Sequence, residues 1–130
     1  MKITRFEDLE IWKLARELVK KVYRLSGKGD MAKDFKFRDQ WRDSTRSIMD
    51  NPAEGFERGG NKEFSHFLSI AKGSAGESRS QSYSAFDLNY INQEEFDDVF
   101  QDLVVVSGKI SHLMEYLRES DIKGIKFKRD

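Results

Sequence analysis

The chain has 130 residues, enough for one hydrophobic core, and we expect a single domain over residues 1–120 with a short flexible tail at 121–130. Its 23 basic and 23 acidic residues leave no net charge, so bulk charge does not point to nucleic acid or to any other partner class. The absence of cysteine excludes disulfides and thiolate metal ligands, and no apolar run is long enough to cross a membrane, so we expect a cytoplasmic protein without a membrane partner.

Four stretches repeat apolar residues every three or four positions, as amphipathic helices do, and no stretch shows the alternation of a strand. The first helix is predicted from Thr4 to Leu25. Thr4 and Glu7 have the spacing of a capping box at its start, and the glycines of residues 26–30 end it.

The second helix is predicted over residues 34–55, with Trp41 among its core-facing positions. Pro52 lies inside this pattern. Because proline lacks a backbone N–H and disfavours helical geometry at the residue before it, we expect a kink or break near residues 48–52, followed by a short turn through Phe56.

The third helix is predicted over residues 62–89, with Asn61 as its N-cap, and the fourth over residues 92–117. Asn92 and Glu95 have capping-box spacing at the start of the fourth. Short connections between four long helices indicate an all-α fold, the antiparallel up-down-up-down four-helix bundle.

Two rows of basic residues recur at four-residue spacing along the first two helices. They are Arg16, Lys20 and Arg24 on the first helix and Arg38, Arg42 and Arg46 on the second. Such a row on an exposed face can follow nucleic-acid phosphates, which dominate sequence-independent affinity. The alternative is a solvated face neutralised by acidic residues three positions away, and the charge pattern alone favours this alternative.

The candidate catalytic and metal patterns are incomplete. Glu63 and His66 have the Glu-x-x-His spacing of di-iron bundles, but His112 has Lys109 three residues before it, so the second copy is missing. A further acidic group comprises Asp97, Asp98 and Asp102. It is better explained by the dipole at a helix start than by a cation site. We therefore predict no metal, no cofactor and no enzymatic activity.

Small residues and surplus aromatic residues favour self-association. Gly73 and Gly76 lie in the third helix, where each glycine costs about 1 kcal/mol relative to alanine. We therefore expect another helix, from the same chain or an adjacent subunit, to approach closely there. The aromatic residues beyond what one thin core readily buries are Phe35, Phe37, Tyr83, Phe86, Tyr90 and Phe127.

Three motifs together resemble one small family. The first runs from Phe6 through Leu9 and Trp12 to Ala15; the second comprises Gln40, Ser47, Ile48, Asn51, Ala53, Glu54 and Gly55; the third comprises Glu63, Phe64, Phe67, Leu68, Ile70, Ala71, Gly73, Ser74 and Glu77. The chain resembles the 23S ribosomal RNA intervening-sequence proteins, also labelled S23 ribosomal proteins, nearly throughout. It departs from their pattern at Pro52, and at Ser44 and Ser78, where a looser core is expected.

This resemblance implies a four-helix bundle that assembles as a ring, most often a homopentamer. A related protein is the accessory subunit of diversity-generating retroelements, a pentameric barrel that binds nucleic acid and a reverse transcriptase. The signature positions Asn51, Glu54, Gly55, Gly73, Ser74 and Glu77 are interpreted as structural. For Asn51, Glu54 and Gly55 the alternative is a subunit interface or a ligand cleft at that end of the bundle. The leading functional hypothesis is a non-enzymatic homo-oligomer that binds RNA or DNA; the alternative is a structural oligomer that engages only another protein.

Overall fold

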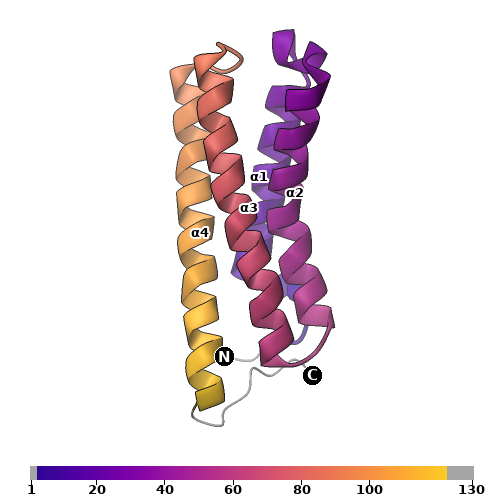
Figure 1. Cartoon of the computed structure of the whole chain (residues 1–130), viewed down its shortest axis with the longest axis vertical. Coiled ribbons are helices and arrows are strands. Elements are labelled where there is room, and N and C mark those ends of the chain that lie inside the picture. Colours follow the sequence, from indigo (N-terminus) through magenta and orange to yellow (C-terminus); the bar gives the residue numbers. More distant parts are fainter. Residues whose placement is uncertain (1–2, 123–130) are drawn as a thin grey trace.

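The computed structural model describes residues 3–122, with side chains described for residues 3–120. Its elements are η1 (Phe6–Asp8), α1 (Glu10–Ser26), η2 (Gly29–Lys33), α2 (Phe35–Glu57), α3 (Asn61–Asp87) and α4 (Gln93–Ile122), η denoting a 3-10 turn. Successive helices run in opposite directions and pack side by side, and α4 also packs against α1 (Figure 1). The predicted all-α antiparallel four-helix bundle is confirmed, and the described range contains no strand.

The core lies where the apolar stripes of the four helices face one another. Its largest fully buried side chains include Leu18, Trp41, Ile48, Phe64, Leu68, Leu103 and Ile110. These residues recur at helical spacing in the sequence, so burying each stripe against the other three is what holds the helices together.

Ser44 and Ser78 are buried in this core and both are hydrogen-bonded. The indole nitrogen of Trp41 donates to Ser78 Oγ at 3.1 Å, and Thr45 Oγ1 lies 2.9 Å from the same oxygen. Ser44 Oγ donates to the side-chain oxygen of Gln81 at 2.6 Å. These bonds offset the cost of burying hydroxyl groups, so α2 and α3 are joined by polar contacts where an apolar residue would only pack.

The start of α1 differs from its prediction. The helix begins at Glu10 rather than Thr4, because Leu9 has an extended backbone (φ −69°, ψ 127°) that separates it from the η1 turn. The predicted Thr4–Glu7 capping box is wrong. Tertiary contacts decide this segment: the ring of Phe6 packs edge-on against Trp12 at 5.2 Å and Leu9 is buried.

The other helix starts follow the sequence more closely. The capping box of α4 is confirmed: Glu95 N donates to Asn92 Oδ1 at 2.8 Å, and Asn92 N donates to Glu95 Oε1 at 2.9 Å. The residue that precedes α3 is Gly60, with a φ of 68° that favours glycine, so Asn61 is the first helical residue rather than the N-cap.

α2 is continuous through Pro52, so the predicted break is wrong, whereas a kink there stays a prediction. Pro52 is buried, and its packing accompanies the loss of one backbone hydrogen bond. Asn51 Nδ2 donates to the carbonyl oxygen of Ser47 at 3.0 Å, not to that of Ile48, the carbonyl four residues before Pro52. At the other end of the bundle, α4 extends to Ile122, and the rest of the expected tail, residues 123–130, lies outside the described residues.

Candidate functional site

The two predicted basic rows meet at Tyr23 of α1. The guanidinium carbon of Arg42, on α2, lies 4.5 Å from the centroid of the Tyr23 ring. Arg46, one turn further along α2, forms a hydrogen bond with the Tyr23 side chain, and this bond, together with the nearby Asp50 carboxylate, raises the pKa of its guanidinium. Arg16 and Lys20 precede Tyr23 by seven and three residues and so share its helix face. The α1–α2 face therefore carries cations from both rows.

Two members of the α2 row are committed to contacts within the bundle. Arg42 is half-buried, and its Nε donates to Ser26 Oγ at 2.7 Å. Arg38, also half-buried, donates from Nη1 to the Ala32 carbonyl at 3.0 Å and lies over the Phe35 ring at 4.9 Å. Arg42 thus ties α2 to the end of α1, while Arg38 ties it to η2, and both are less available to an external phosphate than their spacing suggested.

The remaining members of the rows are exposed. Lys20 pairs with Glu17 at 3.0 Å and Arg46 with Asp50 at 3.5 Å. Arg24 is exposed and makes no ion pair with any described residue. Exposed pairs of this kind contribute at most about 1 kcal/mol, so a phosphate can replace either carboxylate at little cost.

We define the α1–α2 basic face as the four cations that point away from the core here. They are Arg16, Lys20, Arg24 and Arg46. Arg16 also lies over the ring of Trp12, at 5.6 Å from its centroid. The face therefore combines cations with the half-buried rings of Trp12 and Tyr23.

Lys21 is a charged contact that sequence reasoning missed. Its Nζ lies 2.7 Å from Asp102 Oδ2 and 2.9 Å from Asp98 Oδ1, joining α1 to α4. Partial burial lowers the pKa of Lys21, but the hydrogen bonds and charges of Asp102 and Asp98 outweigh it, and the pKa is raised above its ordinary value. The available signal was the four-residue spacing of Asp98 and Asp102, which places both carboxylates on one face of α4. Their role is to bind Lys21, beyond the helix-dipole effect expected from the sequence.

A hydrogen-bonded chain links the signature residues of α2 and α3. Ser74 Oγ donates to Ser47 Oγ at 2.7 Å, and Asn51 Nδ2 donates to the same oxygen at 2.7 Å. Beside this chain, Gln40, Asp43, Ser44, Ser47, Ser74 and Glu77 line a shallow hollow of about 370 Å³. Glu77 is exposed at its edge. The bond between Ser74 and Ser47 joins α3 to α2, and a structural role for the signature positions stays a prediction.

The glycines of the signature have different surroundings. A Cβ at Gly55 would lie 2.6 Å from Phe67 Cβ, so only glycine lets α2 and α3 approach as they do. A Cβ at Gly73 or Gly76 would meet nothing within 4 Å in the described chain, so the close approach expected there does not come from this chain's described helices. Glu54 pairs with Arg58 at 2.7 Å, and Arg58 follows α2 directly, four residues after Glu54.

Part of the predicted aromatic surplus is exposed and part is covered. Phe35 is 63% exposed and Tyr83 50% exposed, whereas Phe37, Phe86 and Tyr90 are half-buried against the core. Phe127 lies outside the described residues. Tyr83 contacts the rings of Phe96 and Phe100 of α4 at 5.1 and 5.6 Å. Tyr83 of α3 is therefore half-exposed while its ring contacts two rings of α4.

A second group of cations was not found from the sequence. Lys62 and Lys72 of α3 and Arg118 of α4 line a hollow of about 430 Å³ between the two helices, with Ser65 and Ser111. Arg118 is paired with Glu115. The three cations come from two helices and share no periodic row, so only the packing of α3 on α4 brings them together.

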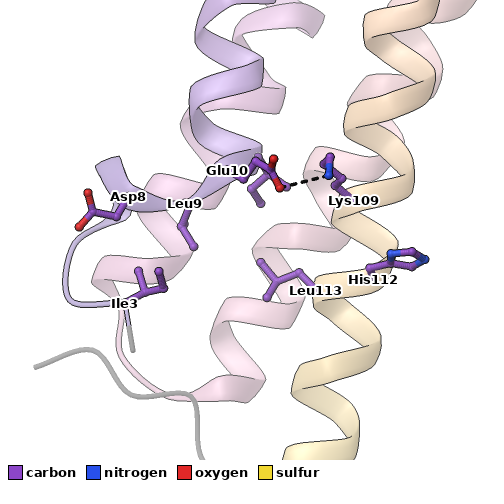
Figure 2. Close-up of a pocket in the computed structure, with 8 residues that line it drawn as sticks. Ile3, Asp8, Leu9, Glu10, Lys109, His112 and Leu113 are labelled. Atoms are coloured by element: carbon purple, nitrogen blue, oxygen red, sulfur yellow. Dashed lines mark ion pairs between the residues drawn. The ribbon is translucent and has the colours of Figure 1, made fainter. Parts of the chain in front are cut away.

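A third hollow, of about 320 Å³, lies between the start of α1 and α4. Figure 2 shows Ile3, Leu9 and Leu113 around it, with Glu10 and Lys109 paired at one side. The Glu63–His66 pattern lies elsewhere, on exposed positions of α3. Across the described side chains, no group of three or more histidine or acidic residues is placed to hold a metal ion.

None of the described helices is both long enough and apolar enough to cross a membrane.

The sequence profile of the family described as 23S rRNA-intervening sequence protein matches residues 7–112. No curated protein matches the chain. A similar solved structure is a Bacteroides thetaiotaomicron protein with unknown function from the S23 ribosomal protein family, with a TM-score of 0.72 and 18% identity over 81% of this chain and 95% of that one.

Proposed function

Because the chain belongs to the 23S rRNA-intervening sequence protein family, we propose that it is a non-enzymatic, homo-oligomeric helical module that binds RNA or DNA through the α1–α2 basic face. The single observation that carries the proposal is the meeting of the two basic rows at Tyr23. Taken by itself, neither row differs from an ordinary solvated helix face. Joined, they present cations from two helices on one side of the bundle.

Phosphate neutralisation is the chemistry that this face supports. Lys20 and Arg46 exchange weak surface carboxylate pairs for phosphate contacts, while Arg24 needs no exchange within the described chain. Four phosphate contacts correspond to a slope of roughly −3 in a plot of log K against log salt for a single strand. The nearby rings of Trp12 and Tyr23 offer limited stacking surface, and phosphate contacts carry no sequence information, so we expect binding without sequence preference.

The direct test is a paired charge reversal, Lys20→Glu with Arg24→Glu. Neither side chain holds the core, since among the described residues Lys20 bonds only Glu17 and Arg24 is exposed. The matched control is Lys62→Glu with Lys72→Glu, the same change of charge on exposed positions of α3. Affinity for a fluorescent single-stranded RNA and DNA of about 20 nucleotides is measured by anisotropy across salt concentrations from about 50 to 200 mM.

We expect the α1 variant to lose about tenfold or more in affinity at low salt and to reduce the magnitude of the salt slope by about 1.4, whereas the control retains its affinity. Circular dichroism and sedimentation check that fold and assembly persist. An equal loss in both variants would assign the effect to overall charge. A loss in the control alone would move the site to the α3–α4 hollow, and wild-type protein that binds no nucleic acid at low salt refutes the proposal.

The rival function is a structural oligomer that engages another protein without nucleic acid. It is favoured by the half-exposed Tyr83 and the exposed Val104 on the α3–α4 side, and by Gly73 and Gly76, where an added Cβ meets nothing in the described chain. The same surface supports self-association in the leading proposal, where the resemblance suggests a ring of five and a relation to the retroelement accessory subunits. Both proposals place the protein in the cytoplasm.

Sedimentation velocity of a Val104→Glu variant tests the self-association shared by both proposals. A charge on an exposed interface position separates subunits without disturbing the monomer, because Val104 is 40% exposed in the isolated chain. We expect the wild type to sediment as an oligomer and the variant as a smaller species. A wild-type monomer at all accessible concentrations would refute self-association. An intact oligomer without nucleic-acid affinity would favour the rival.

A further inference from the structure

The hollow between α3 and α4 collects cations that the α1–α2 basic face does not include. Lys62 and Lys72 of α3 and Arg118 of α4 line it, and its volume is about 430 Å³. This volume falls within the range of small-molecule sites, roughly 300–1,000 Å³. Among its described lining residues Glu115 is the only acidic one, so three positive charges face one negative charge. The excess of positive charge favours an anion, and a dianion would balance it.

The cations of the hollow have donors to spare. Lys62 and Lys72 are exposed, and neither makes an ion pair or a hydrogen bond with a described residue. Arg118 binds Glu115, three residues before it on α4, but both hydrogen bonds start at Nη2. A guanidinium has five N–H donors in a planar fork, so the donors on Nε and Nη1 remain for a second anion. A ligand can therefore bind Arg118 without breaking its pair with Glu115.

The packing of α3 on α4 directs Lys72 and Arg118 toward each other. The two helices run side by side in opposite directions (Figure 1), and Tyr83 contacts both Phe96 and Phe100. With an equal rise on both helices, residue 118 lies level with the first turn of α3, about 13 Å along the axis from residue 72. Helical side chains lean toward the start of their own helix, so these two long side chains narrow the gap from both ends. The bond from Arg118 to the residue three positions earlier shows this lean.

Two hydroxyl groups line the hollow between these cations. Ser65 precedes Lys72 by seven residues and Ser111 precedes Arg118 by seven, so each serine shares a helix face with its cation. Both serines are half-buried, and neither hydroxyl bonds a described residue. Met114, also half-buried, lines the hollow on α4. The hydroxyls can donate to the oxygens of an anion held by the cations, while Met114 offers an apolar contact to an attached organic group.

We propose that the α3–α4 hollow binds a phosphate dianion, carried by a phosphate monoester or by inorganic phosphate, between Lys72 and Arg118. Ser65 and Ser111 donate hydrogen bonds to its oxygens, and Lys62 adds a third positive charge at the start of α3. A monoester carries close to two negative charges at neutral pH, whereas each phosphate of a nucleic-acid strand carries one. The hollow therefore favours the monoester over the strand backbone, and it is a site separate from the α1–α2 basic face.

Titration followed by NMR tests the site in the full chain. Methyl phosphate, inorganic phosphate and dimethyl phosphate are added separately to isotope-labelled protein at neutral pH and constant ionic strength. We expect methyl phosphate to saturate and to shift the amides of Ser65, Lys72 and Ser111, and dimethyl phosphate, a phosphodiester, to bind about tenfold more weakly. Tighter binding of methyl phosphate than of inorganic phosphate would assign the organic ester as the source. Binding of inorganic phosphate that is as tight or tighter would assign the free ion, and both results support the site.

Two matched variants separate the hollow from a general effect of charge. The test variant is Lys72→Ala with Arg118→Ala, and the control is Lys36→Ala with Arg79→Ala. Each removes one exposed lysine and one exposed arginine, and the control residues line neither the hollow nor the α1–α2 basic face. We expect the test variant to bind methyl phosphate about tenfold more weakly or worse and the control to change by less than about twofold. Circular dichroism checks that both variants stay folded.

Four results would overturn the phosphate site. Equal losses in the two variants would reduce it to overall charge, and shifts confined to amides away from the hollow would place the ligand elsewhere. Dimethyl phosphate that binds as tightly as methyl phosphate would contradict the preference for a dianion. Methyl phosphate that does not saturate at tens of millimolar would mean that the hollow binds no phosphate. None of these results bears on the α1–α2 basic face, since Lys20 and Arg24 are unchanged in every variant.

Discussion

Gly55→Ala is the substitution whose outcome the structure determines most sharply. The new Cβ would lie 2.6 Å from Phe67 Cβ, 3.2 Å from its Cγ and 3.3 Å from Phe64 Cδ1. The closest of these atoms is the first atom of a side chain on α3, so relief requires the two helices to separate. Overpacking of this kind costs about 1–3 kcal/mol, and the change from glycine to alanine inside a helix returns about 1 kcal/mol.

We therefore expect Gly55→Ala to lower the free energy of unfolding by up to about 2 kcal/mol. The matched control is Gly108→Ala, also inside a helix, where the added Cβ meets nothing within 4 Å and should raise the free energy by up to about 1 kcal/mol. Urea denaturation followed by circular dichroism measures both under one set of conditions. If Gly55→Ala is as stabilising as Gly108→Ala, the close approach of α2 and α3 at this position is wrong.

Three further substitutions test other contacts. Asn92→Ala removes the cap of α4 and should lower stability by about 1 kcal/mol in thermal denaturation; no change would mean that the capping box contributes nothing. Ser78→Ala leaves the buried indole N–H of Trp41 without its acceptor and should lower the free energy of unfolding, measured in urea, by about 1–3 kcal/mol. A smaller effect would mean that water replaces Ser78 as the acceptor. Lys21→Met should destabilise the protein at neutral pH. Because the pKa of Lys21 is raised in the folded state, its contribution to stability is present below its ordinary pKa and is lost as pH rises beyond about 10.5. The difference in the free energy of unfolding between wild type and variant should therefore narrow above that pH. A gap that stays constant would refute the role of its bond to Asp102.

The helices themselves were predictable because their signals are local. Apolar spacing located all four, and the Asn92–Glu95 box marked the start of α4 correctly. The same capping pattern was wrong at Thr4, where the backbone of Leu9 is extended, Leu9 is buried and the ring of Phe6 packs against Trp12. Pro52 is buried inside a continuous α2, although the chemistry of proline alone disfavours a helix.

The candidate site was predictable only in part. The spacing of Arg38 and Arg42 does not reveal that both side chains are tied to the α1–α2 connection, because Ser26, Ala32 and Tyr23 belong to other elements. Lys21 and Asp102 are 81 residues apart, so the four-residue spacing of Asp98 and Asp102 places both carboxylates on one face of α4 without identifying their partner. Lys62 and Arg118 line one hollow only because α3 packs on α4, and their positions in the sequence do not indicate it.

Residue order alone was enough for the fold and the family, since helical periodicity, glycine turns and the signature around Asn51 and Gly55 are all written along the chain. Tertiary packing decided which cations remain exposed and which are committed to the bundle. The physical reason is distance: the local terms act within about four residues, whereas Tyr23 meets Arg42 only after two helices have packed. The α1–α2 basic face is consequently a product of packing rather than of either row.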